Sequence, residues 1–306
     1  IRRNILKIKR FWSKEMTKWP KTDANLILIF EVFLMFAFFL MNASDQILQS
    51  KDISHYIVAG SFPISSFFVG LLDGFSIETL ILIERASWWF HILGILAFLN
   101  YVLISKHLHI FFAFPSTYYA NINKLGKIDN LSSVTKEVKL ILDPNADPFA
   151  NSDSSENLPS SLFGARDATD LNWVQLLNAY SCTECGRCSS VCPANQTGKL
   201  LSPRKVMMDT RDRIEDVGNN KNEDKFLLGD YMSNEELWAG TTCNACTDAC
   251  PINLDPMSII VDLRRYLVME KSSAPTELNN MFSNIENNGA PWQFPAADRL
   301  NWIEEQ

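Results

Sequence analysis

The twelve residues from Cys182 to Pro193 constrain this chain more than any other stretch. They read C-T-E-C-G-R-C-S-S-V-C-P, so four cysteines follow one another with two, two and three residues between them, and a proline closes the run. This spacing is typical of an iron–sulfur motif in which the first three thiolates bind one cluster and the fourth cysteine binds another cluster. The chain is therefore expected to contain a second motif that completes both sites.

The second motif lies downstream, where residues 243–251 read C-N-A-C-T-D-A-C-P. It lacks its first cysteine, because Gly240 stands at the position that the spacing assigns to that residue. Since the cysteine before each proline is carried away from its own loop, the two motifs are expected to exchange their last ligands. The first cluster is then assigned to Cys182, Cys185, Cys188 and Cys250. The second is assigned to Cys192, Cys243 and Cys246, with Gly240 at the vacant corner.

Three cysteines leave the nature of the second cluster open. They can hold a [3Fe-4S] cluster, or a [4Fe-4S] cluster whose fourth iron takes water, hydroxide or a nearby oxygen ligand from Thr241, Thr242 or Asp248. A single base change also converts a cysteine codon to glycine, so a sequence variant at position 240 is a further interpretation. Paired C-x-x-C units bind zinc as well, but the complete first run is far more specific for iron–sulfur clusters.

The two halves of the sequence differ in composition. Nearly all long apolar runs lie before residue 115, and all seven cysteines lie after it. Residues 1–24 form a basic arm, since eight Lys or Arg residues and one acidic residue, Glu15, occur among the first 21 positions. Such an arm beside an apolar run is typical of the cytoplasmic flank of a membrane helix. Nucleic-acid binding is the rival interpretation, but no aromatic-interleaved basic surface follows.

Residues 25–114 are expected to form a membrane domain. The stretches at about 25–47 and 86–106 are long enough to span a hydrocarbon core about 30 Å thick. Residues 57–72 are fewer and contain Pro63, which favours a re-entrant or interfacial segment. With the basic arm inside, the second span returns the chain to the cytoplasm, where thiolates held for metal stay reduced. We therefore expect a multi-pass protein of the bacterial inner (cytoplasmic) membrane with its cluster domain in the cytoplasm.

The second half begins with a linker over residues 115–170, which is rich in Pro, Asn, Asp and Ser and has one short amphipathic stretch, 134–142. Residues 276–306 are expected to form a tail that contacts a partner. No G-x-G-x-x-G loop occurs in the sequence, so direct binding of a dinucleotide is not expected.

A helical ferredoxin domain is expected over residues 171–275. One helix, 203–214, follows Ser202 as its N-cap, and another, 257–269, follows Asp255. No convincing alternating strand pattern appears in this half. The fold class is therefore all-α: transmembrane helices followed by a cytoplasmic α-helical two-cluster ferredoxin domain.

The sequence contains four histidines, and two of them have the spacing of haem ligands. His91 and His109 are 18 residues apart, which is five helical turns, so they are expected on the same side of one helix, about 27 Å apart. Two b-type haems near opposite membrane faces would need axial histidines so placed. The alternative is that His91 packs at the interface and His109 lies among the headgroups. A second ligand for His91 would come from His55 or from helices outside this chain.

Several sequence blocks carry a resemblance to known families. They are C-T-E-C-G-R-C, L-S-P-R-K, L-W-A-G-T-T-C-N-A-C, M-S-I-I-V-D-L-R-R-Y and N-I-E-N-N-G-A-P-W, all between Leu171 and Trp302. This part resembles the heterodisulfide-reductase-related iron–sulfur oxidoreductases, whose cluster domain is similar to the helical ferredoxin domain of the succinate dehydrogenase iron–sulfur subunit. The stretches H-I-L-G-I-L-A-F, from His91, and H-I-F-F-A-F-P-S-T-Y-Y, from His109, are similar to the final helix of the cytochrome b (gamma) subunit of respiratory nitrate reductase.

The resemblance to the nitrate reductase subunit implies that His91 and His109 ligate the irons of different haems. The chain as a whole resembles electron-transfer flavoprotein:menaquinone oxidoreductases. Three features depart from these families: Gly240 replaces a cysteine, the earlier helices that supply the other haem ligands are absent, and so are the C-terminal C-C-G domains. The sequence also starts at Ile1. We therefore expect a truncated chain, a processed chain or a split gene.

The sequence thus predicts a membrane-bound electron-transfer subunit that connects a cytoplasmic redox partner with the (mena)quinone pool through two iron–sulfur clusters and b haem. No catalytic acid, base or nucleophile is visible, so substrate chemistry is assigned to a partner such as a C-C-G iron–sulfur subunit or an electron-transfer flavoprotein. Glu31, within the first span, or a group near Lys106 could handle the quinone proton, although Glu31 could equally reach the interface. The alternatives are a membrane-anchored ferredoxin without haem, and a non-enzymatic protein with structural or sensory clusters.

Overall fold

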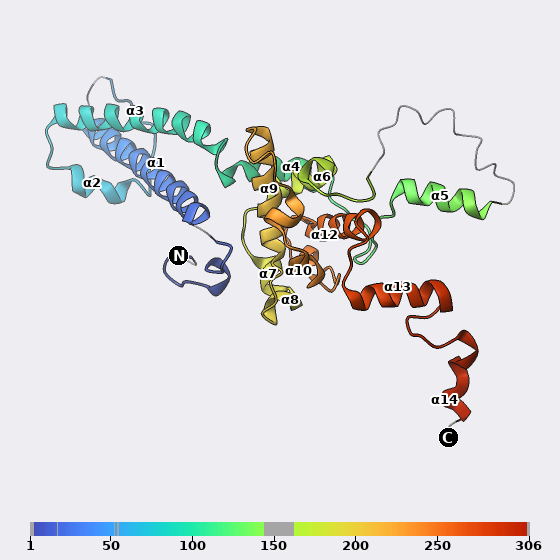
Figure 1. The fold of residues 1–306 in the computed structure, drawn as a ribbon. Coiled ribbons are helices and arrows are strands. Elements are labelled where there is room, and N and C mark those ends of the chain that lie inside the picture. The colour runs from blue at the N-terminus through green and yellow to red at the C-terminus, as the bar shows by residue number, and fades with distance from the viewer. Residues whose placement is uncertain (1–2, 17, 52, 54, 144–161, 305–306) are drawn as a thin grey trace. The chain divides into compact units, whose positions relative to one another are not determined.

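The computed structural model describes residues 3–16, 18–51, 53, 55–143 and 162–304 (Figure 1). Within these ranges the chain forms helices and turns and no strand, apart from one isolated bridge between Leu228 and Met232. The all-α prediction is therefore confirmed for the described residues. The chain divides into two compact units, residues 1–112 and 113–306, which are described in turn. Most of the Ser- and Asn-rich part of the expected linker lies outside the described residues.

The first unit is a helical hairpin. Helix α1 (Lys18–Ser50) packs along α3 (Ile77–Val102), and the short α2 (Ser66–Leu72) packs on α1. A small core of Ala43, Ile47, Leu48, Leu72 and Leu80 closes one end of the hairpin. Residues 57–65, which precede α2, form no helix, so the segment expected at 57–72 is helical only in its second half.

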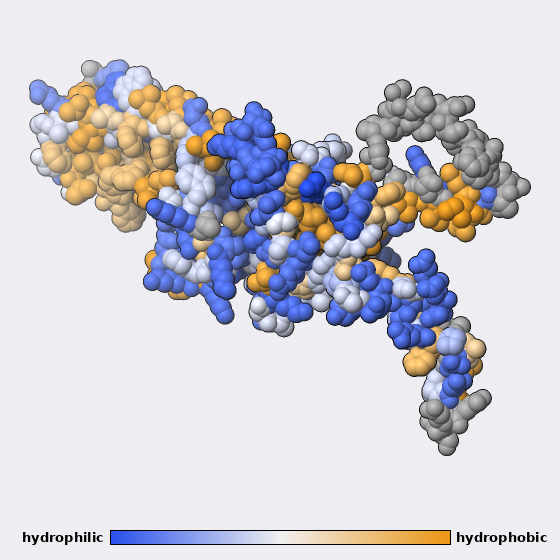
Figure 2. Space-filling view, in the orientation of Figure 1, coloured by the Kyte–Doolittle hydropathy of each residue, from blue (hydrophilic) through white to orange (hydrophobic). Residues whose placement is uncertain are grey.

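Both long helices carry apolar side chains on their outer surface. Each is long and apolar enough to cross a membrane, and only 17% and 11% of their most apolar windows are buried. Val32 and Leu82, for example, are 66% and 68% exposed, and Figure 2 shows the hydrophobic surface over these helices. Contiguous apolar surface on a protein is typical of a site of interaction with lipid or with another protein.

Helix α3 starts at Ile77, well before the expected Ala86. Ser76 caps it, because its hydroxyl accepts a hydrogen bond from the N–H of Thr79, and Glu78 lies in the first turn, where the helix dipole favours an acidic side chain. The charged residues Glu84 and Arg85, which directly precede the expected span, therefore lie inside the helix.

The prediction that His91 and His109 lie on one helix is wrong. Helix α3 ends at Val102, and His109 starts a separate helix, α4 (His109–Tyr118), after a short turn. Ser105 is extended and interrupts the helix, since its hydroxyl caps the turn by accepting from the N–H of His107 and donates to the carboxylate of Asp23. Buried Asp23 thus fixes the interruption.

The second unit is built from short helices, and Figure 1 labels all of them except α11. They are α5 (Ser132–Leu142), α6 (Trp173–Ser181), α7 (Arg187–Val191), α8 (Pro193–Gln196), α9 (Pro203–Gly218), α10 (Asn234–Trp238), α11 (Ala245–Asp248), α12 (Pro256–Arg265), α13 (Thr276–Asn288) and α14 (Asn301–Glu304). Helices α9 and α12 pack against each other and against α6. Their buried residues, including Val206, Met207, Ile259, Ile260 and Leu263, make the centre of the core.

The helix starts expected for α9 and α12 are confirmed. The hydroxyl of Ser202 accepts a hydrogen bond from the N–H of Lys205, and the carboxylate of Asp255 accepts one from the N–H of Ser258. Each cap is followed by proline at the first helical position, which needs no hydrogen-bond partner for its nitrogen. Helix α9 continues beyond the expected residue 214 to Gly218, and α12 ends at Arg265, where a wider turn follows.

A buried ion pair closes the second unit. Arg213 on α9 donates from Nη2 to Oδ2 of Asp167 at 2.7 Å and from Nε to Oδ1 at 2.8 Å. The N–H groups of Ala168 and Leu227 also donate to this carboxylate. Burial opposes its charge, but these donors hold the pKa of Asp167 below its ordinary value. Three separate segments therefore meet at one side chain and support the helices that carry the cysteines.

Candidate functional site

The first cysteine loop starts where α6 ends. Cys182 is the C-cap of α6, Glu184 and Gly186 have φ values of 56° and 72°, and α7 then begins at Arg187. The left-handed conformation at Gly186 allows the tight turn that a glycine adopts without strain. Cys192 directly precedes Pro193, which starts α8. The loop therefore turns sharply after its first two cysteines, and its last cysteine lies at the start of another helix.

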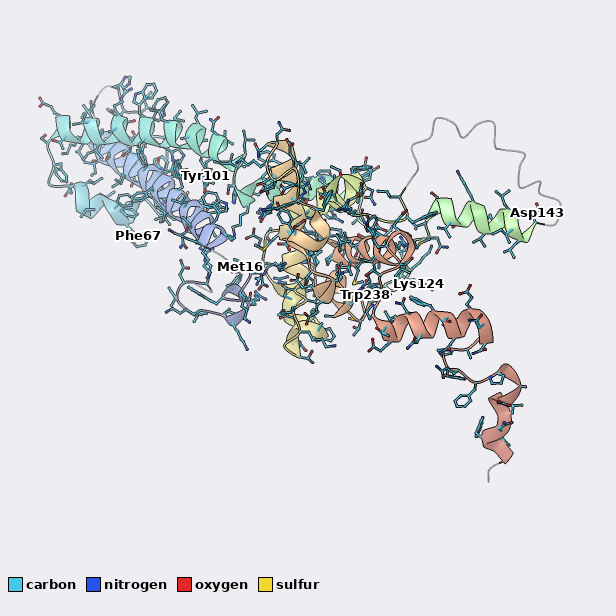
Figure 3. All side chains as sticks on the ribbon, viewed as in Figure 1. Met16, Phe67, Tyr101, Lys124, Asp143 and Trp238 are labelled. Atoms are coloured by element: carbon cyan, nitrogen blue, oxygen red, sulfur yellow. The ribbon has the colours of Figure 1, made fainter. Side chains whose placement is uncertain are left out.

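The second cysteine loop follows α10, whose last residue, Trp238, is labelled in Figure 3. Thr242 and Asn244 have φ values of 58° and 57°, which is unusual for a β-branched residue such as threonine. Cys246 lies in the short α11, and α11 packs against α7 of the first loop. The two motifs, which are far apart in the sequence, are therefore neighbours in the second unit.

The thiols of the first proposed group lie near one another. Burial raises the pKa of Cys182 to about 12, and the nearby Cys188 and Cys185 add to the rise. Burial raises the pKa of Cys188 to about 11, with further contributions from the nearby Cys185 and Cys250. Cys250, from the second motif, is thus close enough to Cys188 to influence its ionisation.

The second group is less enclosed. Burial raises the pKa of Cys246 to about 12, and the nearby Cys188 and Cys192 contribute as well. Cys243 is exposed, and its pKa is lowered because the N–H of Ala245 and the side chain of Thr241 form hydrogen bonds with its sulfur. Such bonds favour the thiolate, which is the form that binds metal.

The cysteines of the two loops are of the ligand type that iron–sulfur clusters need. All seven cysteines carry free thiols, and both loops offer hydrogen-bond donors to sulfur. Among the described residues, no group of three or more His, Cys, Asp or Glu side chains is arranged to hold a metal ion.

Gly240 is in contact with an arginine that the sequence analysis missed. Nη2 of Arg264, on α12, donates to the carbonyl of Gly240 at 2.8 Å, and Nη1 donates to Oγ1 of Thr242 at 3.0 Å. Of the candidate oxygen ligands, Thr242 is therefore bound to Arg264, Thr241 to Cys243, and Asp248 is exposed on α11. The basic last turn of α12 was the only sequence signal for Arg264.

The two candidate haem ligands, His91 and His109, each form a hydrogen bond with a backbone carbonyl. Nδ1 of His91 lies 2.9 Å from the carbonyl oxygen of Leu34, and Nδ1 of His109 lies 2.9 Å from that of Lys106. A carbonyl only accepts, so Nδ1 carries the proton in both rings and Nε2 has the lone pair. Metal-ligating histidines usually have this arrangement. Both residues therefore fit an axial role, although His91 lies within α3 and His109 is the first residue of α4.

The other two histidines have different neighbours. Nε2 of His55 lies 3.3 Å from Nη2 of Arg85. Nε2 of His107 lies 3.9 Å from Oε1 of Glu31, which places Glu31 near the turn that contains Lys106. Among the described residues, no contact of His55 with His91 is found, so the structure gives no support for His55 as its opposing ligand.

Similarity to known proteins decides the nature of the cysteine loops. Residues 181–253 match the family model described as "4Fe-4S double cluster binding domain". The chain therefore carries a domain of the type that binds two [4Fe-4S] clusters. The matched region contains both cysteine loops, α7 to α11 and Gly240.

Curated relatives point to the same class of protein. The chain is 29% identical, over 92% of its length, to the "Probable iron-sulfur-binding oxidoreductase FadF" of Bacillus subtilis, and covers 41% of that protein. It is 26% identical, over 99% of its length, to the "EtfAB:quinone oxidoreductase" of Syntrophomonas wolfei, and covers 43% of it. It is 30% identical, over 46% of its length, to the "Probable membrane-anchored ferredoxin" of Chromohalobacter salexigens, and covers 24% of it.

The chain thus spans less than half the length of each of these relatives. No solved structure matches it. The chain is therefore a relative of iron–sulfur oxidoreductases and electron-transfer proteins with a helical double-cluster domain.

Proposed function

We propose that this chain is a membrane-bound electron-transfer subunit that carries electrons between a cytoplasmic redox partner and the quinone pool. The observation that carries the proposal is the packing of two cysteine loops within a double-cluster domain, with Cys188 beside Cys250 of the other loop. Proteins conduct electrons through such paired clusters because each cluster accepts and releases one electron without a proton donor or nucleophile. Electron transfer of this kind therefore needs no catalytic acid or base from the chain.

We assign Cys182, Cys185, Cys188 and Cys250 to one cluster and Cys192, Cys243 and Cys246 to the other. The protein's own contribution is to deprotonate, hold and shield these thiolates. Burial keeps Cys182 and Cys246 away from water, and the N–H of Ala245 stabilises the charge on Cys243. Burial, charge and hydrogen bonds to sulfur set the reduction potential of a cluster. The site that contains the buried Cys182 and the site that contains the exposed Cys243 should therefore hold clusters of different potential.

The hairpin of α1 and α3 is proposed to anchor the protein in the bacterial cytoplasmic membrane. Its exposed apolar surface, the basic residues that precede α1 and the relative named as a membrane-anchored ferredoxin support this assignment. The cluster domain then lies on the cytoplasmic side. The name of another relative contains both EtfAB and quinone, which supports an electron-transfer flavoprotein as the partner and quinone as the membrane acceptor or donor. A C-C-G iron–sulfur subunit as a further partner, and menaquinone as the quinone, are proposed from the sequence resemblance alone.

His91 and His109 are proposed as axial ligands of b haem. The hydrogen bonds from Nδ1 to Leu34 and Lys106 leave Nε2 available in both rings. Haem would supply a one-electron relay within the membrane. The second axial ligands would come from membrane helices outside this chain, because His55 and His107 are bound to Arg85 and Glu31 instead.

Two other functions remain as alternatives with distinct outcomes. A membrane-anchored ferredoxin would have the clusters and no haem, which the name of one relative favours. A structural or sensory protein would keep its clusters without conducting electrons.

The deciding experiment measures quinone-linked electron flow in membranes that contain the native complex. Cys188→Ala is expected to abolish that flow, because it removes one ligand of the enclosed cluster. The matched control is Ser190→Ala, which changes an exposed residue of the same loop whose hydroxyl donates to the carbonyl of Arg187 at 2.7 Å. Unchanged flow in C188A would reject conduction, and a reduced-minus-oxidised spectrum without a b-type alpha band would reject the haem.

A further inference from the structure

The guanidinium of Arg264 forms hydrogen bonds with the turn that leads into the second cysteine loop. Nε of Arg264 donates to the carbonyl of Leu237 at 3.0 Å, Nη2 donates to the carbonyl of Gly240 at 2.8 Å, and Nη1 donates to Oγ1 of Thr242 at 3.0 Å. Cζ also lies 5.2 Å from the centre of the Trp238 ring. The turn that ends directly before Cys243 is therefore held at three points by one side chain. These bonds include the strained Thr242, whose positive φ needs support from its surroundings.

Because Gly240 has no side chain, the guanidinium of Arg264 can lie close to its backbone. A Cβ atom on residue 240 would lie 3.0 Å from Nη2 of Arg264 and 2.9 Å from Cδ2 of Leu201. The backbone of Gly240 does not need a glycine, because its φ is outside the left-handed region. The close approach of Arg264 and Leu201 is therefore what a side chain at residue 240 would have to displace. A cysteine at this position would require the ends of the Arg264 and Leu201 side chains to shift from their observed places.

The charge of Arg264 has only neutral partners in this turn. Its hydrogen-bond acceptors are two carbonyl oxygens and one hydroxyl. The side chain is half-buried, and this burial lowers its pKa. A charge taken out of water usually has a counter-charge nearby. The three cysteines assigned to the second site bring such negative charge when they bind as thiolates, directly after the turn that Arg264 holds.

We propose that Arg264 serves the second cluster site as a cationic positioning residue in the place of the missing fourth cysteine; this inference rests on the proposed function. It holds the turn before Cys243 and places a positive charge beside a site that has one thiolate fewer than its neighbour. Net charge and nearby hydrogen bonds set the reduction potential of a cluster. Arg264 therefore raises the potential of the second cluster relative to that of the same site without the cation, and it leaves the first cluster unchanged.

The test compares the full chain, purified in detergent, with Arg264→Met and Arg264→Lys. Iron and acid-labile sulfide counts report how many clusters are held, and redox titration followed by EPR reports the potential of each. We expect R264M to retain the second cluster at a lower potential or to lose it, while the first cluster keeps its wild-type potential. R264K keeps the charge but not the forked hydrogen bonds, so its second potential should lie between those of R264M and the wild type.

The matched control is Arg265→Met. Arg265 is the next residue of α12, and its Nη1 pairs with Oδ1 of Asp262 at 2.8 Å instead of binding the turn. Both cluster potentials should stay at the wild-type value in R265M. Wild-type iron content with unshifted potentials in R264M would overturn the inference. Failure of the proposed function looks different, because the wild-type protein would then either lack iron and sulfide or hold its clusters without supporting quinone-linked electron flow.

Gly240→Ala tests the same idea if R264M does not accumulate as folded protein. Its added methyl group presses against the guanidinium and Leu201 while Arg264 remains in the sequence. We expect G240A to shift the second potential in the same direction as R264M, and by less. Unshifted second potentials in both G240A and R264K would equally overturn the role of Arg264.

Discussion

Asp23 at the start of α1 accepts a hydrogen bond from the hydroxyl of Ser105, 82 residues later, at 2.8 Å. The hydroxyl of Tyr101 and the N–H of Lys106 donate to the same carboxylate, at 2.5 and 3.1 Å. The side chain of Tyr101 is labelled in Figure 3, and Asp23 is only 2% exposed. One buried carboxylate therefore connects the beginning of the hairpin with the turn that directs the chain toward His109.

Asp23→Ala should destabilise the first unit by about 2–4 kcal/mol, because it leaves several buried donors without an acceptor. The measurements are thermal unfolding in detergent and limited proteolysis within residues 103–108, which should become faster. Ser105→Ala removes only one donor and should cost about 1 kcal/mol. Equal melting temperatures for D23A and the wild type would contradict the role of this carboxylate.

Exchange of ligands between the two motifs predicts which cysteine variants resemble one another. Cys182→Ala and Cys250→Ala should lose or alter the same cluster signal in EPR, although these residues belong to different motifs. Cys192→Ala and Cys243→Ala should affect the other signal. Each variant should also lower the iron content per chain. If C250A instead altered the signal that C243A alters, the assignment of ligands across the motifs would be wrong.

Local signals in the sequence predicted the frame of the cluster domain. Ser202 and Asp255, each followed by proline, start α9 and α12 because a cap and the first turn depend only on adjacent residues. The cysteine spacing identified the two loops for a similar reason, since a motif fixes which residues of one short segment can reach a cluster. The family match over residues 181–253 agrees with that interpretation.

Local sequence patterns did not predict features that depend on contacts between residues far apart in the chain. The helical period predicted one continuous helix from His91 to His109, yet the chain turns at Ser105 because of Asp23, which lies far away in the sequence. Arg264 likewise could not be linked to Gly240 from sequence, because their contact depends on how α12 packs against α10. Both errors concern polar groups whose partners are distant along the chain.

His91→Ala and His109→Ala should each reduce the b-haem absorbance of membranes that contain the native complex by about half, if the two residues ligate different haems. Each ring is held by a bond from Nδ1, so loss of the ring removes both the ligand and its orientation. His55→Ala is the control and should keep the full absorbance, since His55 lies beside Arg85. A full reduced-minus-oxidised alpha band in both H91A and H109A would exclude them as ligands.

The thiols of the metal-free protein should differ in their response to pH. The pKa of Cys243 is lowered from 9, so its thiolate persists to lower pH, whereas the raised pKa of Cys182, about 12, keeps that thiol protonated near pH 8. Because the thiolate is the nucleophile, iodoacetamide should modify Cys243 before Cys182 at about pH 8. Peptide mass spectrometry after timed labelling measures both rates.

Exposure alone would also favour Cys243, so a variant must separate the two causes. Thr241→Val removes the side chain that forms a hydrogen bond with the Cys243 sulfur, and leaves its exposure nearly unchanged. The pKa of Cys243 should then rise, and its labelling should need a higher pH. The same labelling profile in T241V and the wild type would show that exposure, and not the hydrogen bond, sets the rate.

Gly240→Cys tests whether position 240 is a corner of the second site. If the wild-type cluster is [3Fe-4S], the new thiolate should add about one iron per chain and remove the EPR signal that such a cluster gives when oxidised. If it is [4Fe-4S] with a non-cysteine ligand, the iron count should stay the same and the spectrum of the reduced cluster should change. Since a Cβ at 240 would meet Leu201 at 2.9 Å and Arg264 at 3.0 Å, conversion should be incomplete in G240C and more complete when R264M is added. Unaltered iron content and spectra in both the single and the double variant would mean that Gly240 does not face the cluster, and that the three-cysteine site has no corner there to fill.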